Sequence, residues 1–151
     1  GMYESDWTRL PRIFFAGGIT NCPEWQQVMK GLLQNEEFIF INPRRANFPI
    51  HDPTAAEAQI RWEYNYLELA TAISFWFPCE TLNPITLFEL GRWSSPDVEW
   101  FRPLFVGVHP DYKRKQDVEI QLKLSRPDVK IVYSLEALAE QIKMYLKEGT
   151  N

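Results

Sequence analysis

The sequence predicts an α/β fold, a flavodoxin-like doubly wound sheet of five parallel strands with helices on both faces. Three observations lead to this prediction. Short apolar segments alternate regularly with longer segments of helical character. Strands that are apolar throughout are typical of a parallel sheet that is covered on both sides. Five such units within 151 residues suit the flavodoxin-like class.

The strands are expected where apolar residues run together and a turn signal follows. They comprise residues 12–16, 38–41, 73–77, 104–108 and 129–132. Gly17-Gly18 ends the first strand and Asn42-Pro43 the second. In the order 2-1-3-4-5, the winding would reverse between the first and third strands. The loops 17–20 and 78–83 would then face each other across one crevice, where α/β proteins usually bind ligands.

The helices are expected between these strands, and proline fits the first turn of three of them. Pro23 begins a helix to residue 33, Pro53 begins one to residue 70, and Pro84 begins the helix that carries Glu89. Two further helices are expected over residues 115–124 and 135–146. Residues 12–147 are therefore predicted to form a single domain, with residues 1–11 as an N-terminal extension in which Gly1 is interpreted as a tag remnant.

Composition narrows the possible partners. Sixteen basic residues against 20 acidic ones give a pI near 5.2, which does not favour binding to nucleic acid. The sequence has no apolar segment long enough to predict a membrane span, and its N-terminus has no targeting signal. A cytoplasmic protein is therefore expected. Cys22, Cys79, His51 and His109 make a poor metal-ligand set. The chain lacks GxGxxG and GxxxxGK[ST] motifs, so no cofactor is expected.

Two acidic residues are the candidates for catalysis. Glu89 stands between Phe88 and Leu90 in a helix start that follows the most apolar strand. Such apolar surroundings would remove water from the carboxylate, which suits a nucleophile or an acid/base. The alternative interpretation is a solvated glutamate that is favoured by its place near a helix N-terminus. Glu63, on the preceding helix, is a second candidate, with an ion pair to Arg61 as its alternative.

Substrate-binding candidates follow the same edge of the sheet. Glycine at positions 17 and 18 lets the backbone approach a ligand, although a tight turn would explain the pair equally well. Adjacent guanidinium groups after the second strand suit a phosphate or carboxylate, unless one of them is a structural clamp. The expected substrate-binding residues are Gly17, Gly18, Ile19, Asn42, Arg44, Arg45, Trp62 and Asn83.

The segments Ile13–Ile19 and Phe88–Arg92, together with the long acidic and aromatic helix between them, resemble the nucleoside 2-deoxyribosyltransferase family. The resemblance implies a nucleoside or nucleotide substrate, a homo-oligomer, and cleavage or exchange of an N-glycosidic bond. It assigns the nucleophile to Glu89 and the proton-handling acid to Glu63. Two alternatives remain: a 2′-deoxynucleoside 5′-monophosphate N-hydrolase and a non-catalytic nucleotide-binding sensor. Several family members carry aspartate where this chain has Asn83.

Overall fold

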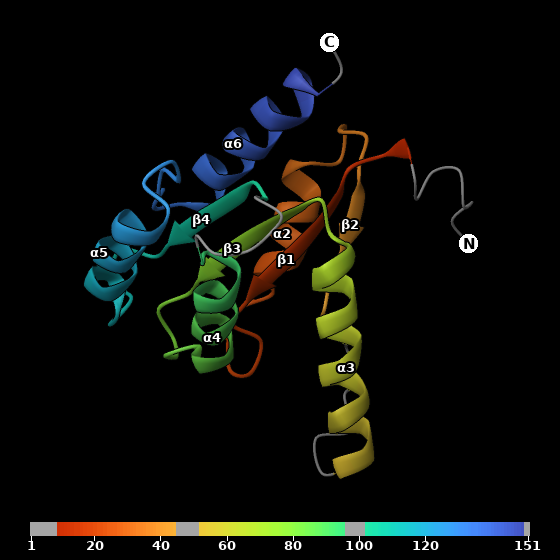
Figure 1. Ribbon diagram of the computed structural model, residues 1–151, viewed down its shortest axis with the longest axis vertical. Coiled ribbons are helices and arrows are strands. Elements are labelled where there is room, and N and C mark those ends of the chain that lie inside the picture. The colour runs from red at the N-terminus through yellow and green to blue at the C-terminus, as the bar shows by residue number, and fades with distance from the viewer. Residues whose placement is uncertain (1–8, 45–51, 96–101, 150–151) are drawn as a thin grey trace.

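The described part of the chain forms one sheet of four parallel strands. The computed structural model describes residues 9–44, 52–95 and 102–149, and within them the strands are β1 (Arg12–Gly17), β2 (Ile39–Ile41), β3 (Ala72–Phe77) and β4 (Leu104–Val108). Their order is β2-β1-β3-β4 (Figure 1). Ile13 is paired with Phe40 on one side and with Ala72 on the other. The winding therefore reverses between β1 and β3, as it does in the flavodoxin-like order.

The prediction of a fifth strand at residues 129–132 is wrong. Only Val132 pairs, in a single bridge to Gly107, where it accepts a hydrogen bond from Val108 N and donates one to Val106 O. The residues before it are turned, because Val129 N donates to Arg126 O. Helix α6 begins directly afterwards at Leu135. Too few extended residues remain between that turn and that helix to form a strand.

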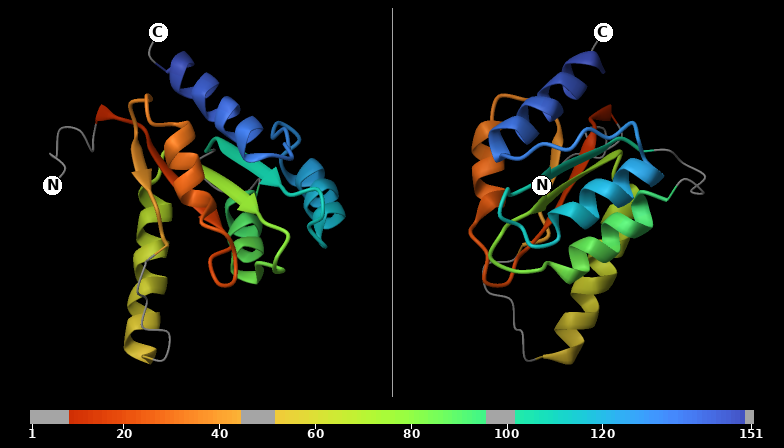
Figure 2. Two further views of the ribbon diagram at one scale, coloured as in Figure 1. Left: turned by 180° about the vertical axis from the view of Figure 1, so that it is seen from behind. Right: turned by 90° about the vertical axis from the view of Figure 1, so that its left-hand side faces the viewer.

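Five described helices cover the two faces of the sheet. Helices α2 (Trp25–Leu32) and α6 (Leu135–Glu148) lie on one face, and α3 (Pro53–Leu69), α4 (Pro84–Trp93) and α5 (Lys115–Ser125) lie on the other (Figure 2). Alternate side chains of each strand supply the two cores: Ile13 and Phe15 pack with α2 and α6, and Phe14 and Ala16 pack with α3 and α4. This alternation is the period-two geometry of a strand that is buried on both sides.

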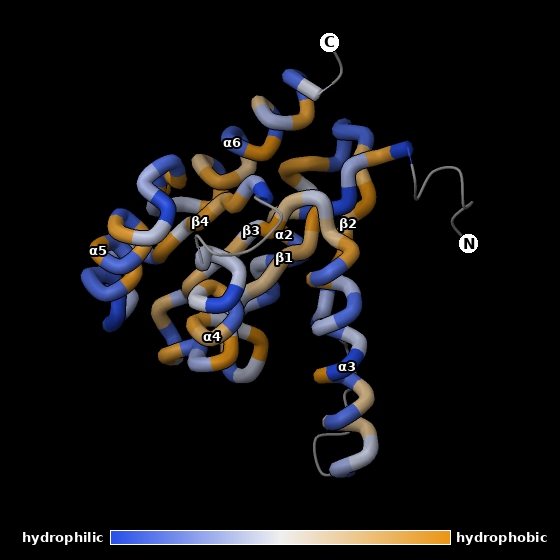
Figure 3. The backbone as a smooth tube through the Cα atoms, in the orientation of Figure 1, coloured by the Kyte–Doolittle hydropathy of each residue, from blue (hydrophilic) through white to orange (hydrophobic). Residues whose placement is uncertain are grey.

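Helix α3 is the longest of the described elements. Asp52 caps its N-terminus by accepting a hydrogen bond from Thr54 N at 2.9 Å, and Pro53 occupies its first turn. Only Leu67 of its 17 residues is buried, and its N-terminal half projects beyond the sheet (Figure 1). Figure 3 shows mainly hydrophobic central strands and a mainly hydrophilic α5. Within the described ranges, no helix has the length and apolar character that crossing a membrane requires.

Candidate functional site

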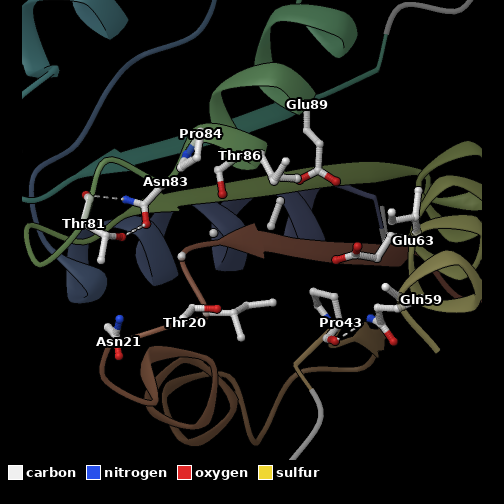
Figure 4. A pocket seen from close by; sticks show the side chains of 17 residues that line it. Thr20, Asn21, Pro43, Gln59, Glu63, Thr81, Asn83, Pro84, Thr86 and Glu89 are labelled. Atoms are coloured by element: carbon white, nitrogen blue, oxygen red, sulfur yellow. Dashed lines mark hydrogen bonds between the residues drawn. The ribbon is translucent and has the colours of Figure 1, made fainter. Parts of the chain in front are cut away.

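A cavity of about 540 Å³ opens at the carboxyl ends of β1 and β3. Its walls are formed by the end of β1 and the loop after it, by Pro43 after β2, by residues 56–63 of α3, and by residues 81–89 around the start of α4 (Figure 4). Its lining residues are Ala16, Gly17, Gly18, Ile19, Thr20, Asn21, Pro43, Ala56, Gln59, Ile60, Glu63, Thr81, Asn83, Pro84, Ile85, Thr86 and Glu89. The cavity thus lies at the reversal of strand order, where ligands of α/β proteins usually bind.

Two carboxylates point into this cavity from different helices, Glu63 from α3 and Glu89 from α4 (Figure 4). Burial raises the pKa of Glu63 to about 7. Burial, and then the neighbouring charge of Glu63, raise the pKa of Glu89 to about 8. No residue of the described ranges donates a hydrogen bond or forms an ion pair to either carboxylate. Both acids are therefore strongly desolvated and electrostatically coupled.

This coupling determines the chemistry that the pair can perform. Near pH 7 to 8 the two groups together hold about one proton, and the apparent pKa values belong to the pair. One carboxylate can then act as nucleophile or base while the other acts as acid. Among the described residues, no group of three His, Cys, Asp or Glu side chains is placed to hold a metal ion.

The two glycines at the carboxyl end of β1 allow close packing at the wall of the cavity. An added Cβ at Gly17 would lie 2.3 Å from the Trp25 ring, and one at Gly18 would lie 2.1 Å from Asn83 Oδ1. The Trp25 indole donates a hydrogen bond to Gly18 O at 2.9 Å. Ile19 lines the cavity beside them. Gly17 is thus required by the packing of the Trp25 ring, and Gly18 by the join between this turn and the loop that precedes α4.

Asn83 is buried at that join and has the left-handed backbone conformation, with φ 52°. Its Nδ2 donates to Pro78 O at 3.1 Å and to Thr81 O at 3.2 Å, and its Oδ1 accepts from the Thr81 hydroxyl at 2.7 Å. Asn83 lines the cavity. Its amide is nevertheless engaged with its own loop and holds the residues that begin α4.

Asn42 and Trp62 lie beside the cavity and do not line it. They line a neighbouring depression of about 370 Å³, together with Pro43, Ala58 and Gln59. The Asn42 side chain accepts a hydrogen bond from Arg44 N at 2.9 Å. The Trp62 ring packs against Tyr66, with ring centroids 4.5 Å apart. Because Pro43 and Gln59 line both hollows, the two are adjacent.

Arg44 is turned toward the loop after β1. Its guanidinium donates to Cys22 O at 2.8 Å and to Pro23 O at 2.6 Å, and it forms an ion pair with Glu24 at 3.2 Å. It does not line the cavity. This geometry is that of a structural clamp. Arg45, the other predicted phosphate ligand, lies outside the described residues.

Several lining residues were not among the sequence candidates. Gln59 lies four residues before Glu63, and Thr86 lies three residues before Glu89. Residues at these spacings share one face of a helix, so this periodicity could have identified them. Thr20, Asn21 and Pro43 also line the cavity, but they follow strand ends in loops that have no such periodicity.

A comparison with known families places these features in context. The family described as nucleoside 2-deoxyribosyltransferase like matches residues 10–103, more than half of the chain. The matched region contains β1 to β3 and the two helices that carry the paired carboxylates. No curated protein sequence matches the chain closely enough to count as a relative. The chain belongs to the nucleoside 2-deoxyribosyltransferase-like family.

Proposed function

We propose that this protein cleaves or exchanges the N-glycosidic bond of deoxynucleosides, with Glu89 as the nucleophile and Glu63 as the proton carrier. The observation that carries the proposal is the pair of desolvated carboxylates that enter one cavity from α3 and α4. Membership of the nucleoside 2-deoxyribosyltransferase-like family supports this choice of substrate. Glycosyl transfer with retention of configuration uses two carboxyl groups in these two roles.

The proposed reaction has two steps. The pair reacts in the singly protonated form that carries its proton on Glu63, which is the less populated of the two arrangements because Glu89 has the higher pKa. In that form the Glu89 carboxylate attacks the anomeric carbon as the bond to the base breaks, and Glu63 donates its proton to the departing base. The sugar is then held as a glycosyl ester on Glu89. A second base or water attacks the same carbon, its proton passes to Glu63, and the Glu89 carboxylate is released. Both carboxyl groups thereby return to their starting states.

A nucleoside fits the cavity better than a 5′-monophosphate. None of the residues that line the described cavity is Lys, Arg or His, and two of them are acids. Arg44 is engaged with the carbonyl oxygens of Cys22 and Pro23. Among the residues that the structure describes, a phosphate dianion in the cavity would meet two carboxylates and no cation, and would be repelled. The monophosphate N-hydrolase is therefore the second candidate.

The test is incubation with matched deoxynucleosides and their 5′-monophosphates, with and without a second free base, followed by separation of the products. A new nucleoside indicates transfer, and free base alone indicates hydrolysis. Cleavage confined to the monophosphates would select the second candidate. Measurable ligand binding without any product would select the sensor and contradict the proposal.

Glu89→Gln is expected to lower turnover by at least about a thousandfold, because an amide cannot serve as the anionic nucleophile. Glu80→Gln is the matched control, since Glu80 is exposed in the loop before α4 and does not line the cavity. Near-normal turnover by Glu89→Gln would exclude this mechanism. Ligand affinity, measured by calorimetry, should largely survive the substitution.

A further inference from the structure

A cluster of charged and aromatic side chains joins the C-terminal ends of helices α3 and α4. We propose that Arg92 is a positioning residue that clamps α4 to α3. The clamp sets the separation between Glu63 on one helix and Glu89 on the other. This inference rests on the proposed function of the two carboxylates, but it can be tested without turnover.

The contacts of Arg92 reach from α4 to α3. Its Nη2 donates to the Tyr64 hydroxyl at 3.1 Å and to Glu68 Oε1 at 3.1 Å. Its guanidinium carbon also lies 4.8 Å from the centre of the Tyr64 ring. Tyr64 and Glu68 are four residues apart, so they present one face of α3 to this arginine. One side chain thereby fixes two positions on the other helix.

Arg102, which precedes β4, completes the clamp. It is buried, and it donates to Leu67 O and to Glu68 O in the last turn of α3. Its guanidinium carbon lies 4.4 Å from the centre of the Trp93 ring, and that of Arg92 lies 4.8 Å from the same ring. Cations over an aromatic face are attracted to it. Trp93 of α4 is therefore shared by the two arginines that hold the end of α3.

The position of the clamp explains how it would act on the carboxylates. Glu89 lies three residues before Arg92 on α4, and Glu63 immediately precedes Tyr64 on α3. The N-terminal half of α3 projects away from the sheet (Figure 1), so the clamp holds the helix near its opposite end. A rotation of α3 about that end would change the separation of the two acids. Their mutual repulsion varies inversely with that separation.

Arg92→Lys is the decisive variant. It keeps the positive charge but loses the planar group that contacts the Tyr64 ring, the Tyr64 hydroxyl and Glu68 together. We expect α3 to shift outward, so that the higher carboxyl pKa of the pair falls by about half a unit as the repulsion weakens. The pKa values are measured by NMR titration of protein with isotope-labelled glutamate side chains. The value of kcat/KM for a deoxynucleoside should fall about tenfold, mainly through kcat.

Arg61→Lys is the matched control, because Arg61 is on α3 but forms its ion pair with Glu57 of the same helix. It should leave the carboxyl pKa values and kcat/KM unchanged. Tyr64→Phe, which changes no charge, should move the upper pKa in the same direction as Arg92→Lys, by a smaller amount.

Unchanged carboxyl pKa values in Arg92→Lys and in Tyr64→Phe would overturn the inference, whatever happens to the melting temperature. A lower melting temperature with a wild-type titration would mark a purely structural role. If the wild-type protein shows no turnover, the proposed function fails, and the titration still decides the role of the clamp.

Discussion

Glu89 is held where its surroundings oppose its charge. Burial and the charge of Glu63 raise its pKa to about 8, and burial raises that of Glu63 to about 7. The proposed reaction requires one ionised and one protonated carboxyl group. Below the lower value both groups are protonated, and above the higher value both are ionised.

The pH dependence of kcat/KM should therefore be bell-shaped, with limbs near pH 7 and pH 8 and a maximum about midway. Steady-state rates with a deoxynucleoside between pH 5.5 and 9.5 would measure it. In Glu63→Gln only the ionisation of Glu89 remains, so the alkaline limb should disappear. A rate that stays constant across this range would contradict the assignment of the two acids.

The same raised pKa values should destabilise the fold at alkaline pH. The unfolded carboxyl group has a pKa near 4.5, so the folded protein binds more protons between that pH and about 8, and stability falls as the pH rises through this window. Glu89→Gln removes the buried charge. At pH 9 it should raise the free energy of unfolding by about 1–3 kcal/mol, less than the full shift because solvent screens part of the effect.

At pH 4.5 the same substitution should change the stability little, because Glu89 is protonated in the folded protein. Urea unfolding at the two pH values makes the comparison, with Glu80→Gln as the exposed control. A Glu89→Gln variant that is less stable than wild type at pH 9 would show that the carboxylate has a stabilising partner.

At the scale of the elements, the sequence predicted the strands and helices that carry strong apolar patterns. The helix begun by Pro53, the apolar strand before Pro78 and the pairing of loops 17–20 and 78–83 across one site all correspond to the structure. The segment at 129–132 failed as a strand because the turn after Arg126 and the start of α6 leave it too short. Apolar composition predicts burial, but it does not reveal such a limit on length.

The candidate site was predictable to the extent that it follows strand ends and helix periodicity. The positions of Glu63 and Glu89 depend on that geometry, and both line the cavity. The direction in which a long side chain points cannot be predicted from this geometry, because it depends on contacts with residues that are distant in the sequence. Arg44 illustrates this, since its carbonyl partners at Cys22 and Pro23 belong to a loop about 20 positions earlier in the chain.

The turn after β1 should tolerate no side chain at Gly18. A Cβ there would lie 2.1 Å from Asn83 Oδ1 and 2.7 Å from Cys22 Sγ, so Gly18→Ala should displace the loop that begins α4. We expect a loss of about 1–3 kcal/mol in stability, the usual scale of overpacking. Gly31→Ala is the control, because no atom lies within 4 Å of its added Cβ within α2. That variant should be neutral or more stable by up to about 1 kcal/mol.

Thermal and urea unfolding of Gly18→Ala and Gly31→Ala would measure the change in stability. The value of kcat/KM would be measured for each variant that folds. A Gly18→Ala variant with wild-type stability and turnover would show that the contact with Asn83 can relax without consequence.

Arg44 should act through the loop that it holds. Arg44→Ala removes the hydrogen bonds to Cys22 O and Pro23 O and frees the segment that follows the glycine turn. Because the guanidinium is directed away from the cavity, we expect a nucleoside and its monophosphate to lose affinity equally. Calorimetric titration of the matched pair measures this. A selective loss of about 1.5–3 kcal/mol for the monophosphate would instead assign Arg44 to the phosphate.

At the scale of the whole molecule, the mouth of the cavity carries an uncovered apolar surface. Ile60 of α3 and Ile85 of α4 line the cavity and are each 65% exposed, and Phe88 of α4 is 74% exposed. Large apolar side chains exposed beside a functional site are typical of an interaction surface. We expect a second copy of the chain to cover this rim and to limit the access of water to the two carboxylates.

Phe88→Ser should therefore weaken self-association and lower kcat/KM, while leaving the monomer folded. Serine avoids a new charge next to Glu89, so any change in rate reflects the lost contact. Leu124→Ser is the matched control, because Leu124 is 80% exposed on α5 and does not line the cavity.

Light scattering coupled to size-exclusion chromatography, over a range of protein concentrations, gives the mass of each variant. A wild-type protein that stays monomeric at all concentrations would contradict the expectation. An oligomer that Leu124→Ser disrupts and Phe88→Ser does not would place the interface on α5, away from the carboxylates.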